Sequence, residues 1–596
     1  MLISRNYLVS SIVLIAALAL QLWLVINLQL FGDESFYWLE SRFPSLSYSE
    51  IPGWNVWMIA LSTQIFGNTY FGVRAFAFLG YFSIFFAITL IQRQLFKETK
   101  FVTSCLLILS VPLLTVVALL ALPDIWMLVF VIWIIYLTIK AIQNQNKWTW
   151  VLLGVLLALA VNIHVRMWIW IFFAGIVYLY HFHDDKNTIK PLLLISFPIM
   201  LIGFIPVLAF NMENEFPLFV FQFSNRHPWS FQTENLYLIV SQVIVVSPIV
   251  LYLCVKTLRA NTKAFSNQTV INWILSTALI HWLFYIITGL FADNVRTSFH
   301  WLLVSYIPVL IMSIGLIQNQ RIVRWSIYSG LAFSILFLIV LILFKQPFSY
   351  WQSRFFDNST GWKQLADEVS QVQKEYKTKN LITDYFMTGA ELAFELNDSN
   401  NLKVLPHEKN IKHGRQKQLE VMGLLLNEPE KYNKHALLVI EDSAIKLSLK
   451  GGYYSGLCDN FSQLHYIKGI NNKQSGKLFH VFEVNNGAET CELAPLIYAH
   501  HEVAENNQLK IKGWVFFHKT GVKQLYLHSE KDLLISKYKQ PITTIDMLYF
   551  QLQDPDSPFH GFEITVDKSE IRNNQYQIKV IGNDEREYFS AKYYLD

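Results

Sequence analysis

The sequence predicts a polytopic α-helical membrane domain that is followed by a soluble α/β domain and a β-sandwich-like module. Of the 596 residues, 53% are hydrophobic and only 15% are charged, whereas soluble proteins carry about a quarter charged residues. The long apolar runs stop near Phe344, and Lys, Glu, Asp and Asn are common after it. We therefore expect a membrane domain over 1–346, an α/β domain over 347–492 and a β-sandwich-like module over 493–596.

Eleven apolar runs are long enough to be spanning helices, because a bilayer core of about 30 Å needs about 20 helical residues. The runs lie near 7–30, 70–91, 101–121, 124–141, 148–165, 167–181, 191–210, 236–255, 270–291, 300–317 and 325–344. The formal net charge of +4 is too small for a chain of this length to indicate nucleic-acid binding. The lipid bilayer is thus the first predicted partner.

The connections between these runs form two alternating sets. One set carries two or three Lys or Arg residues in each connection, at 92–100, 140–147, 181–190, 256–263 and 318–324. Such connections are typical of the cytoplasmic side. The other set would lie outside, at 32–38, 121–126, 162–168, 211–229 and 291–301. Eleven spans then place the C-terminal part outside as well.

The first outer connection, "GDESFYW", presents the carboxylates of Asp33 and Glu34 directly after an apolar run. A carboxylate at the membrane surface can accept a proton from a hydroxyl or hold a divalent cation. Acidic residues are also common as a simple solvated boundary after a span. The other outer connections favour a site, because they carry Arg and His residues that suit an anionic head group. These candidates are His164, Arg166, Arg226, His227, Arg296 and His300.

Taken singly, each of these cations could be an interfacial residue that snorkels to the head groups. Together they predict a binding site for a phosphate beside a carboxylate base. Asp124 and Tyr37, in the same set of connections, are predicted supporting residues. The many Trp and Tyr residues nearby are typical of interfacial belts, although they could also stack on sugars.

The order of these motifs resembles the GT-C membrane glycosyltransferases, and more narrowly the branch of protein O-mannosyltransferases and the lipid A aminoarabinose transferase. The motifs are "GDESFYW", "ALPDIWMLVFVIWIIYL", "GVLLALAVNIHVRMW", "GFIPVLAFNMENEFPLFVFQF" and "NVRTSFHWLLVSYIPVL". After the spans, "STGWKQLADEV", "LITDYFMTGAELAFEL" and "HGRQKQLEVMG" resemble the outer α/β domain of bacterial members. The resemblance covers about residues 1–490.

The resemblance implies an inverting transfer of a sugar from a polyprenyl-phosphate-linked donor to an envelope acceptor, which could be a glycolipid, a polysaccharide or a protein. It places the enzyme in the bacterial cytoplasmic membrane with a periplasmic C-terminal part. Asp33 matches the family's catalytic acidic position, and Glu34 would support it or help to hold a metal. The usual "HPPL" or "KPPL" stretch is replaced by "EIPGWNVWM", which keeps Pro52 but loses the basic residue. His164 and Arg166 stand where many relatives carry a Lys.

Two other classes remain open at this stage. A transporter could carry interfacial charges, but it should show internal repeats, and the sequence shows no clear one. A non-catalytic receptor with an outer sensor domain would leave the charges at the span ends without a purpose.

The part after the spans contains amphipathic helical stretches and short β runs up to about 490, then short strands separated by turns. The last part could bind a sugar or acceptor, or serve only as a packing module. Cys458 and Cys491 could pair in an oxidising compartment, or stay reduced. No cofactor is predicted with certainty, and a divalent metal remains an option.

Overall fold

The computed structural model describes residues 2–96, 100–225, 229–292, 299–343 and 359–595, the last range with gaps at 473–474, 486, 488–489, 494–495, 504–507, 517–521, 530, 536–537, 540–558, 584 and 591. The chain forms two compact units. Unit 1 contains Met1–Leu343 and Ile411–Met422, and unit 2 contains Phe344–Asn410 and Gly423–Asp596. The chain therefore leaves unit 1 after Leu343 and returns to it for one short segment.

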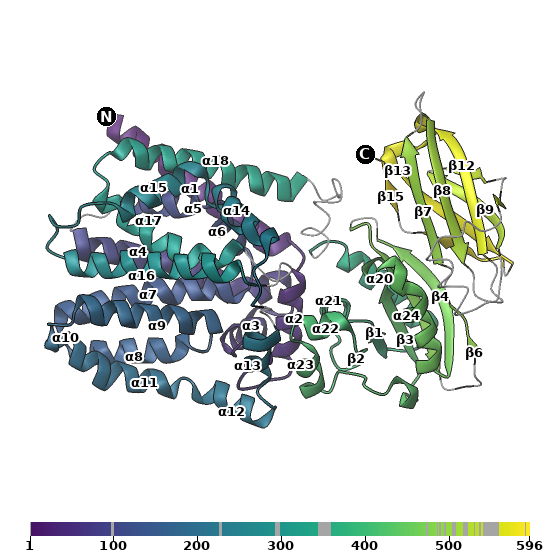
Figure 1. The fold of residues 1–596 in the computed structure, drawn as a ribbon, viewed down its shortest axis with the longest axis horizontal. Helices are drawn as coiled ribbons and strands as arrows, with labels where there is room; N and C mark the ends of the chain where they lie inside the picture. The colour runs from purple at the N-terminus through teal and green to yellow at the C-terminus, as the bar shows by residue number, and fades with distance from the viewer. Residues whose placement is uncertain are drawn as a thin grey trace. The chain divides into compact units, whose positions relative to one another are not determined.

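Unit 1 is a bundle of helices in which α4 packs on α7 and α9 packs on α16 (Figure 1). Its first helices are α1 (Leu2–Asn27), α2 (Gly32–Ser41), α3 (Trp54–Phe66), α4 (Tyr70–Phe96), α5 (Phe101–Leu109), α6 (Pro112–Val117), α7 (Pro123–Asn144), α8 (Lys147–Ala160) and α9 (Val165–His181). The later ones are α10 (Lys186–Pro191), α11 (Phe197–Ile202), α12 (Ile205–Glu213), α13 (Pro217–Phe219), α14 (Tyr237–Val246), α15 (Pro248–Leu258), α16 (Gln268–Gly289), α17 (Leu303–Leu316) and α18 (Gln320–Leu343).

All eleven predicted apolar runs are helical, although several are broken into shorter helices. Among the described residues, five helices are long and apolar enough to cross a membrane, or six if α14 and α15 form one bent span. Shorter apolar helices cover 147–160, 165–181 and 300–316. The helical, multi-span character is thus confirmed, and the number of eleven crossings stays a prediction.

The run at 236–255 was expected to be one helix, but α14 and α15 meet at an angle of 100°. The break lies at Ser247, which has φ 76° and ψ 137°. Pro248 explains it, because proline disfavours helical geometry at the residue before it and has no N–H to continue the ladder.

Unit 2 begins with a mixed sheet in the strand order β2-β1-β3-β5-β4-β6. Strand β1 (Leu381–Thr383) is parallel to β2 (Leu402–Val404) and β3 (Ala436–Glu441), while β5 (Leu478–Asn485) runs antiparallel to β3 and to β4 (Gln463–Asn471). The edge strand is β6 (Thr490–Cys491), and the helices include α20 (Trp362–Glu375), α21 (Phe386–Glu395) and α24 (Leu447–Asn460). The short β runs predicted before about residue 490 are confirmed, with β1, β3 and β5 among them.

The C-terminal residues form two further sheets. One sheet joins β10 (Lys531–Leu534), β9 (Val522–Ser529), β13 (Gln575–Gly582), β14 (Glu587–Phe589) and β15 (Tyr593–Tyr594), and the other joins β11 (Tyr538–Lys539), β12 (Phe559–Asp567), β8 (Gln508–Phe516) and β7 (Leu496–Val503). Alternate residues of β8, β9 and β13 belong to one buried hydrophobic cluster. This shared core favours the predicted sandwich, which remains a prediction, as do the domain boundaries at 346 and 492.

Gly513 in β8 shows why "IKGWVFF" needs a glycine. A Cβ at this position would lie 2.1 Å from the Tyr498 carbonyl oxygen and 2.5 Å from the Phe562 ring. Any side chain would therefore force these neighbouring strands apart.

Cys458 and Cys491 form a disulfide that ties α24 to β6. The two cysteines are 33 residues apart in sequence, and in the chain-entropy model a loop of this length stabilises the fold by about 3–4 kcal/mol. We expect Cys458→Ser to lower the unfolding free energy of unit 2 by about this amount, measured by urea-dependent proteolysis of the full-length protein in detergent.

The double variant Cys458→Ser/Cys491→Ser serves as the matched control, because it removes the same cross-link and leaves no unpaired thiol. The two variants should unfold at the same urea concentration. Unfolding of both at the wild-type concentration would show that the cross-link contributes nothing to stability.

Candidate functional site

Helix α2 carries both predicted carboxylates in its first turn. It begins one residue after Phe31, and the Glu34 side chain accepts a hydrogen bond from the Phe31 amide at 3.0 Å. This is one half of a capping box, and acidic side chains are favourable near the positive end of a helix dipole. The local sequence thus fixes where α2 begins. Because successive residues of a helix are rotated by about 100°, the Asp33 and Glu34 side chains point in different directions.

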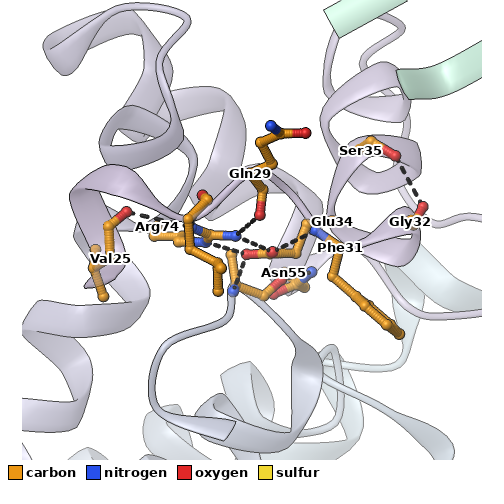
Figure 2. A network of polar contacts seen from close by, with 10 residues as sticks. Val25, Gln29, Phe31, Gly32, Glu34, Ser35, Asn55 and Arg74 are labelled. Carbon is orange, nitrogen blue, oxygen red and sulfur yellow. Dashed lines mark hydrogen bonds and ion pairs between the residues drawn. The ribbon is translucent and has the colours of Figure 1, made fainter. Parts of the chain in front are cut away.

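Glu34 points into the bundle and is completely buried. Its Oε1 accepts from Arg74 Nε at 2.8 Å and from the Ala121 amide at 2.7 Å, and its Oε2 accepts from Arg74 Nη2 at 2.6 Å (Figure 2). With the Phe31 amide, four donors occupy this carboxylate. The catalytic or metal-holding role suggested for Glu34 does not fit this geometry, because both oxygens are already saturated by the protein.

Arg74 is 1% exposed and reaches three carbonyl oxygens besides Glu34. Nη1 donates to Val25 at 3.3 Å and to Leu28 at 2.7 Å, and Nη2 donates to Gln29 at 2.9 Å (Figure 2). Val25 lies in the last turn of α1, and Leu28 and Gln29 directly follow the helix, where carbonyls lack helical partners. The Glu34–Arg74 pair therefore fastens the end of α1, the start of α2 and α4 together.

Asp33, one residue earlier, has the opposite environment. Its side chain is 37% exposed, and Oδ1 accepts from Arg415 Nη2 at 2.7 Å. Among the described residues, Arg415 is the ion-pair partner of this carboxylate. Asp33 is therefore the accessible member of the acidic pair.

Arg415 is 3% exposed and belongs to the segment of unit 1 that follows the spans in sequence. Its Nε donates to Glu50 Oε1 at 3.2 Å, and its guanidinium carbon lies 4.5 Å from the centroid of the Phe36 ring. Arg415 is not among the predicted site residues, although it lies in the motif "HGRQKQLEVMG". No local pattern marks this Arg, because its partners lie hundreds of positions earlier.

A buried pair of carboxyl groups, Glu40 and Glu50, lies next to Arg415, which donates to Glu50. Burial is the main reason that the pKa of Glu50 is raised to about 7 and that the pKa of Glu40 is raised well above its usual value. The charge of Glu50 raises the pKa of Glu40 further. Burial thus favours the protonated, less negative form of this pair beside Arg415.

Tyr37, a predicted supporting residue, is 7% exposed on the same helix. Burial raises the pKa of its phenol well above the usual value, and the Asp33 charge raises it further. The phenol is therefore a neutral neighbour of Asp33.

A second cluster forms around Asp124 at the start of α7. Arg166 Nη1 donates to Asp124 Oδ1 at 2.8 Å, and His300 Nε2 lies 3.4 Å from the same oxygen. His164 Nδ1 accepts from the Arg166 amide at 3.0 Å and so caps the N-terminus of α9. Buried Arg166 Nε has no hydrogen-bond acceptor among the described residues. The structure thus brings together four predicted residues from three separate connections.

Hydrogen bonds join the connections that carry the acidic pair of α2 and the Asp124 cluster. The Asn55 side chain donates through Nδ2 to the carbonyl of Ala121, three residues before Asp124, at 3.1 Å. The Trp54 backbone amide donates to the Asn162 carbonyl at 2.8 Å. Gln222 Nε2 donates to the Glu50 carbonyl at 2.8 Å. Residues from all five connections predicted to be outer therefore meet at one end of the bundle.

Arg226, His227 and Arg296 lie outside the described residues, so their predicted phosphate contacts remain predictions. Among the described residues, no group of three or more His, Cys, Asp or Glu side chains could hold a metal ion. The divalent metal remains a prediction.

An apolar cavity of about 330 Å³ lies between α7, α8, α9, α11 and α16. Its lining includes Val161 and Trp168, which flank His164 and Arg166 in sequence, and extends along α9 to Tyr178. Trp168 Nε1 donates to the Val161 carbonyl at 2.7 Å, which fixes this end of the cavity. The cavity suits an alkyl or prenyl chain, because its walls are almost entirely apolar.

Residues 52–210 match the sequence model of the dolichyl-phosphate-mannose-protein mannosyltransferase family. A sequence search among curated proteins finds no significant match. The crystal structure of ArnT from Cupriavidus metallidurans in the apo state is similar, with a TM-score of 0.59 at 12% identity over 81% of this chain and 98% of that chain. Its structure bound to undecaprenyl phosphate gives a TM-score of 0.56 at 12% identity over 79% and 97%.

The structural similarity extends over nearly the whole length of ArnT, whereas the family match covers the region from α3 to α12 that contains Asp124 and Arg166. Both findings agree with the motif order in the sequence. The chain therefore has the GT-C fold of the membrane glycosyltransferases, which confirms the resemblance recognised from its sequence.

Proposed function

We propose that the protein is a glycosyltransferase that moves a sugar from a polyprenyl-phosphate-linked donor to an envelope acceptor on the outer side of the cytoplasmic membrane. The observation that carries the proposal is that the helix start with the accessible carboxylate of Asp33 is joined, through the hydrogen bond from the Ala121 amide to Glu34, to the connection that carries the Asp124–Arg166–His300 cluster. The solved relative bound to undecaprenyl phosphate supports the donor class.

In the proposed reaction, an acceptor hydroxyl oxygen attacks the anomeric carbon on the face opposite the phosphate. The new carbon–oxygen bond forms as the bond from the anomeric carbon to the phosphate oxygen breaks, so the configuration inverts. Asp33 takes the hydroxyl proton, and polyprenyl phosphate leaves with the bonding electron pair. The sugar and the acceptor are open; a glycolipid, a polysaccharide or a protein would all supply a hydroxyl or amine.

The donor phosphate needs cations at head-group depth, because it gains charge as it leaves. Arg166 suits this role, since its buried Nε has no acceptor among the described residues, and Trp168, two positions later on α9, lines the apolar cavity proposed for the prenyl chain. His300 adds a second group from another connection. We assign His164 to orienting the start of α9, and keep Arg226, His227 and Arg296 as further phosphate-binding candidates.

The disulfide in unit 2 supports an oxidising compartment for the C-terminal part, because disulfides are rare in the bacterial cytoplasm. A periplasmic or other extracytoplasmic location is therefore proposed for unit 2. The transporter and receptor alternatives are less favoured, since neither explains an accessible carboxylate and a separate Arg166–His300 cluster that residues of the predicted outer connections join.

Mass spectrometry of envelope lipids, glycans and proteins tests the function. Cells with and without the gene should differ by the mass of one sugar in one acceptor fraction. No difference in any fraction, together with uptake of a sugar or lipid by proteoliposomes containing the protein, would overturn the proposal in favour of transport.

Arg166→Gln should weaken the binding of undecaprenyl phosphate about 10- to 100-fold, because a hydrogen bond to a charged group contributes about 1.5–3 kcal/mol. The measurement is a titration of the purified protein in detergent. Arg259→Gln, on an exposed residue at the end of α15, is the matched control and should bind like the wild type.

Loss of binding can also arise because the variant removes the guanidinium partner of Asp124. The double variant Arg166→Gln/Asp124→Asn removes the carboxylate charge as well. Recovery of wild-type affinity in the double variant would mean that Arg166 only neutralises Asp124 and does not contact the phosphate.

A further inference from the structure

The segment Ile411–Met422 places one buried cation against the most accessible carboxylate of the site. It comprises the end of α22 (Glu408–Lys412), the turn at Gly414 and Arg415, and α23 (Gln416–Val421). Asp33 and Arg415 are 382 positions apart in sequence. The bundle of spans therefore does not complete this site with its own residues.

Contacts on both sides of Arg415 hold the segment in place. Gly414 has φ 73°, and a Cβ there would lie 2.6 Å from the Phe221 ring, so only glycine fits this approach. Gln418 is completely buried, and its Oε1 accepts from the Ser49 amide at 2.9 Å and from the Ser49 hydroxyl at 3.2 Å. The position of Arg415 is thus fixed by neighbours that do not depend on its charge.

The Arg415–Asp33 contact differs from a purely structural ion pair. In the Glu34–Arg74 pair, both side chains are almost fully buried, at 0% and 1% exposure. In the Arg415–Asp33 pair, the guanidinium side chain is 4% exposed and the carboxylate is 37% exposed. A buried guanidinium that donates to one oxygen of an accessible carboxylate restricts the rotation of the carboxylate. The other carboxylate oxygen then faces an incoming group.

We propose that Arg415 is a positioning residue that fixes the Asp33 carboxylate for proton transfer from the acceptor. Arg415 holds Asp33 Oδ1, which leaves Oδ2 to take the hydroxyl proton. Glu50 holds Arg415 from its Nε side, and Phe36 and Tyr37 cover the guanidinium with their rings. This inference rests on the proposed function and extends it, since it makes a residue beyond the spans part of the transfer site.

The first test measures the contact without relying on transfer. Wild-type protein and Arg415→Gln are labelled with a water-soluble carbodiimide and an amine, and the modification of Asp33 is followed by mass spectrometry. We expect the Arg415→Gln protein to label at Asp33 several-fold faster, because the carboxylate has lost its charged partner. An unchanged rate would overturn the inference.

The second test compares sugar transfer at saturating donor, with the lipid-linked sugar fraction and membranes of the source cells as substrates. Arg415→Gln should lower the maximal rate about 100-fold, as is usual when a group that orients a catalytic residue is lost. It should bind undecaprenyl phosphate within twofold of wild type. Arg415→Lys should recover part of the rate, and added guanidinium should raise the rate of Arg415→Ala about 10-fold.

Lys417→Gln is the matched control, because Lys417 lies on the same segment and its ion pairs within the described part of the chain are with Glu215 and Glu420 at the surface. It should transfer at the wild-type rate. Glu50→Gln keeps the size of the side chain that holds Arg415 and should lower the rate less than Arg415→Gln does. This variant keeps the test informative if Arg415→Gln fails to fold.

The outcomes separate the two proposals. Faster labelling of Asp33 with wild-type transfer, or loss of transfer together with loss of undecaprenyl phosphate binding, would overturn the positioning role. Absence of transfer by the wild-type protein itself, with every fraction of the cell envelope supplied, would instead overturn the proposed function.

Discussion

Asp33→Asn should abolish sugar transfer, with a loss of about 100- to 10,000-fold in rate, because an amide cannot accept the acceptor proton. The substitution keeps the size of the side chain and can still accept a hydrogen bond from Arg415 through its amide oxygen. Asp33 is 37% exposed and lies in the first turn of α2, so the folded bundle should tolerate the change. Transfer is measured in membranes from cells that lack the native gene.

Two further measurements make this result specific. Expression, membrane insertion and undecaprenyl phosphate affinity of Asp33→Asn should equal those of the wild type, since the donor cations lie on other connections. Asp184→Asn is the matched control, because this carboxylate is 92% exposed at the end of the bundle predicted to be cytoplasmic. Transfer by Asp33→Asn at the rate of Asp184→Asn would end the assignment of Asp33 as the base.

Glu34→Gln should produce a different kind of loss. Removing one partner from a buried ion pair typically costs about 3–5 kcal/mol, because the remaining charge stays in a low-dielectric interior. Here Arg74 would keep its carbonyl acceptors but lose its counter-charge. We expect a clear fall in the melting temperature in detergent, measured by size-exclusion chromatography of heated samples. We also expect less folded protein in membranes.

The matched variant for this pair is Arg74→Met. It should destabilise the protein by a similar amount, because it leaves the buried Glu34 carboxylate without its counter-charge. In the double variant Glu34→Gln/Arg74→Met, the stability should partly recover, since no buried charge is left alone. If Glu34→Gln instead melted like the wild type while losing all transfer, Glu34 would act in the chemistry, as the sequence first indicated.

These two predictions separate neighbours that the sequence cannot tell apart. The acidic pair after the first apolar run, the aromatic flanks and the motif order were all visible in the sequence. They were sufficient to predict a membrane-embedded helical domain, an α/β part and a set of short C-terminal strands. Each of those elements depends on local periodicity, so a single chain segment contains the information that determines it.

The second cluster was partly predictable for the same reason. Asp124, His164, Arg166 and His300 each stand at the end of an apolar run, and the alternating charge of the connections predicted that they share one side. The sequence did not show that Arg166 pairs with Asp124, or that His164 caps α9. These pairings depend on how the helix ends meet.

By itself, therefore, the sequence determined the helices, the strands and the position of the acidic pair, whereas the break between α14 and α15 at Pro248 was found only in the structure. The tertiary structure decided which carboxylate is accessible, because one residue of helical rotation turns Glu34 toward Arg74 in the bundle and leaves Asp33 facing Arg415. Both cations come from distant positions, 40 and 382 residues away. No local pattern encodes such contacts, since they form only when the packing of unit 1 brings these segments together.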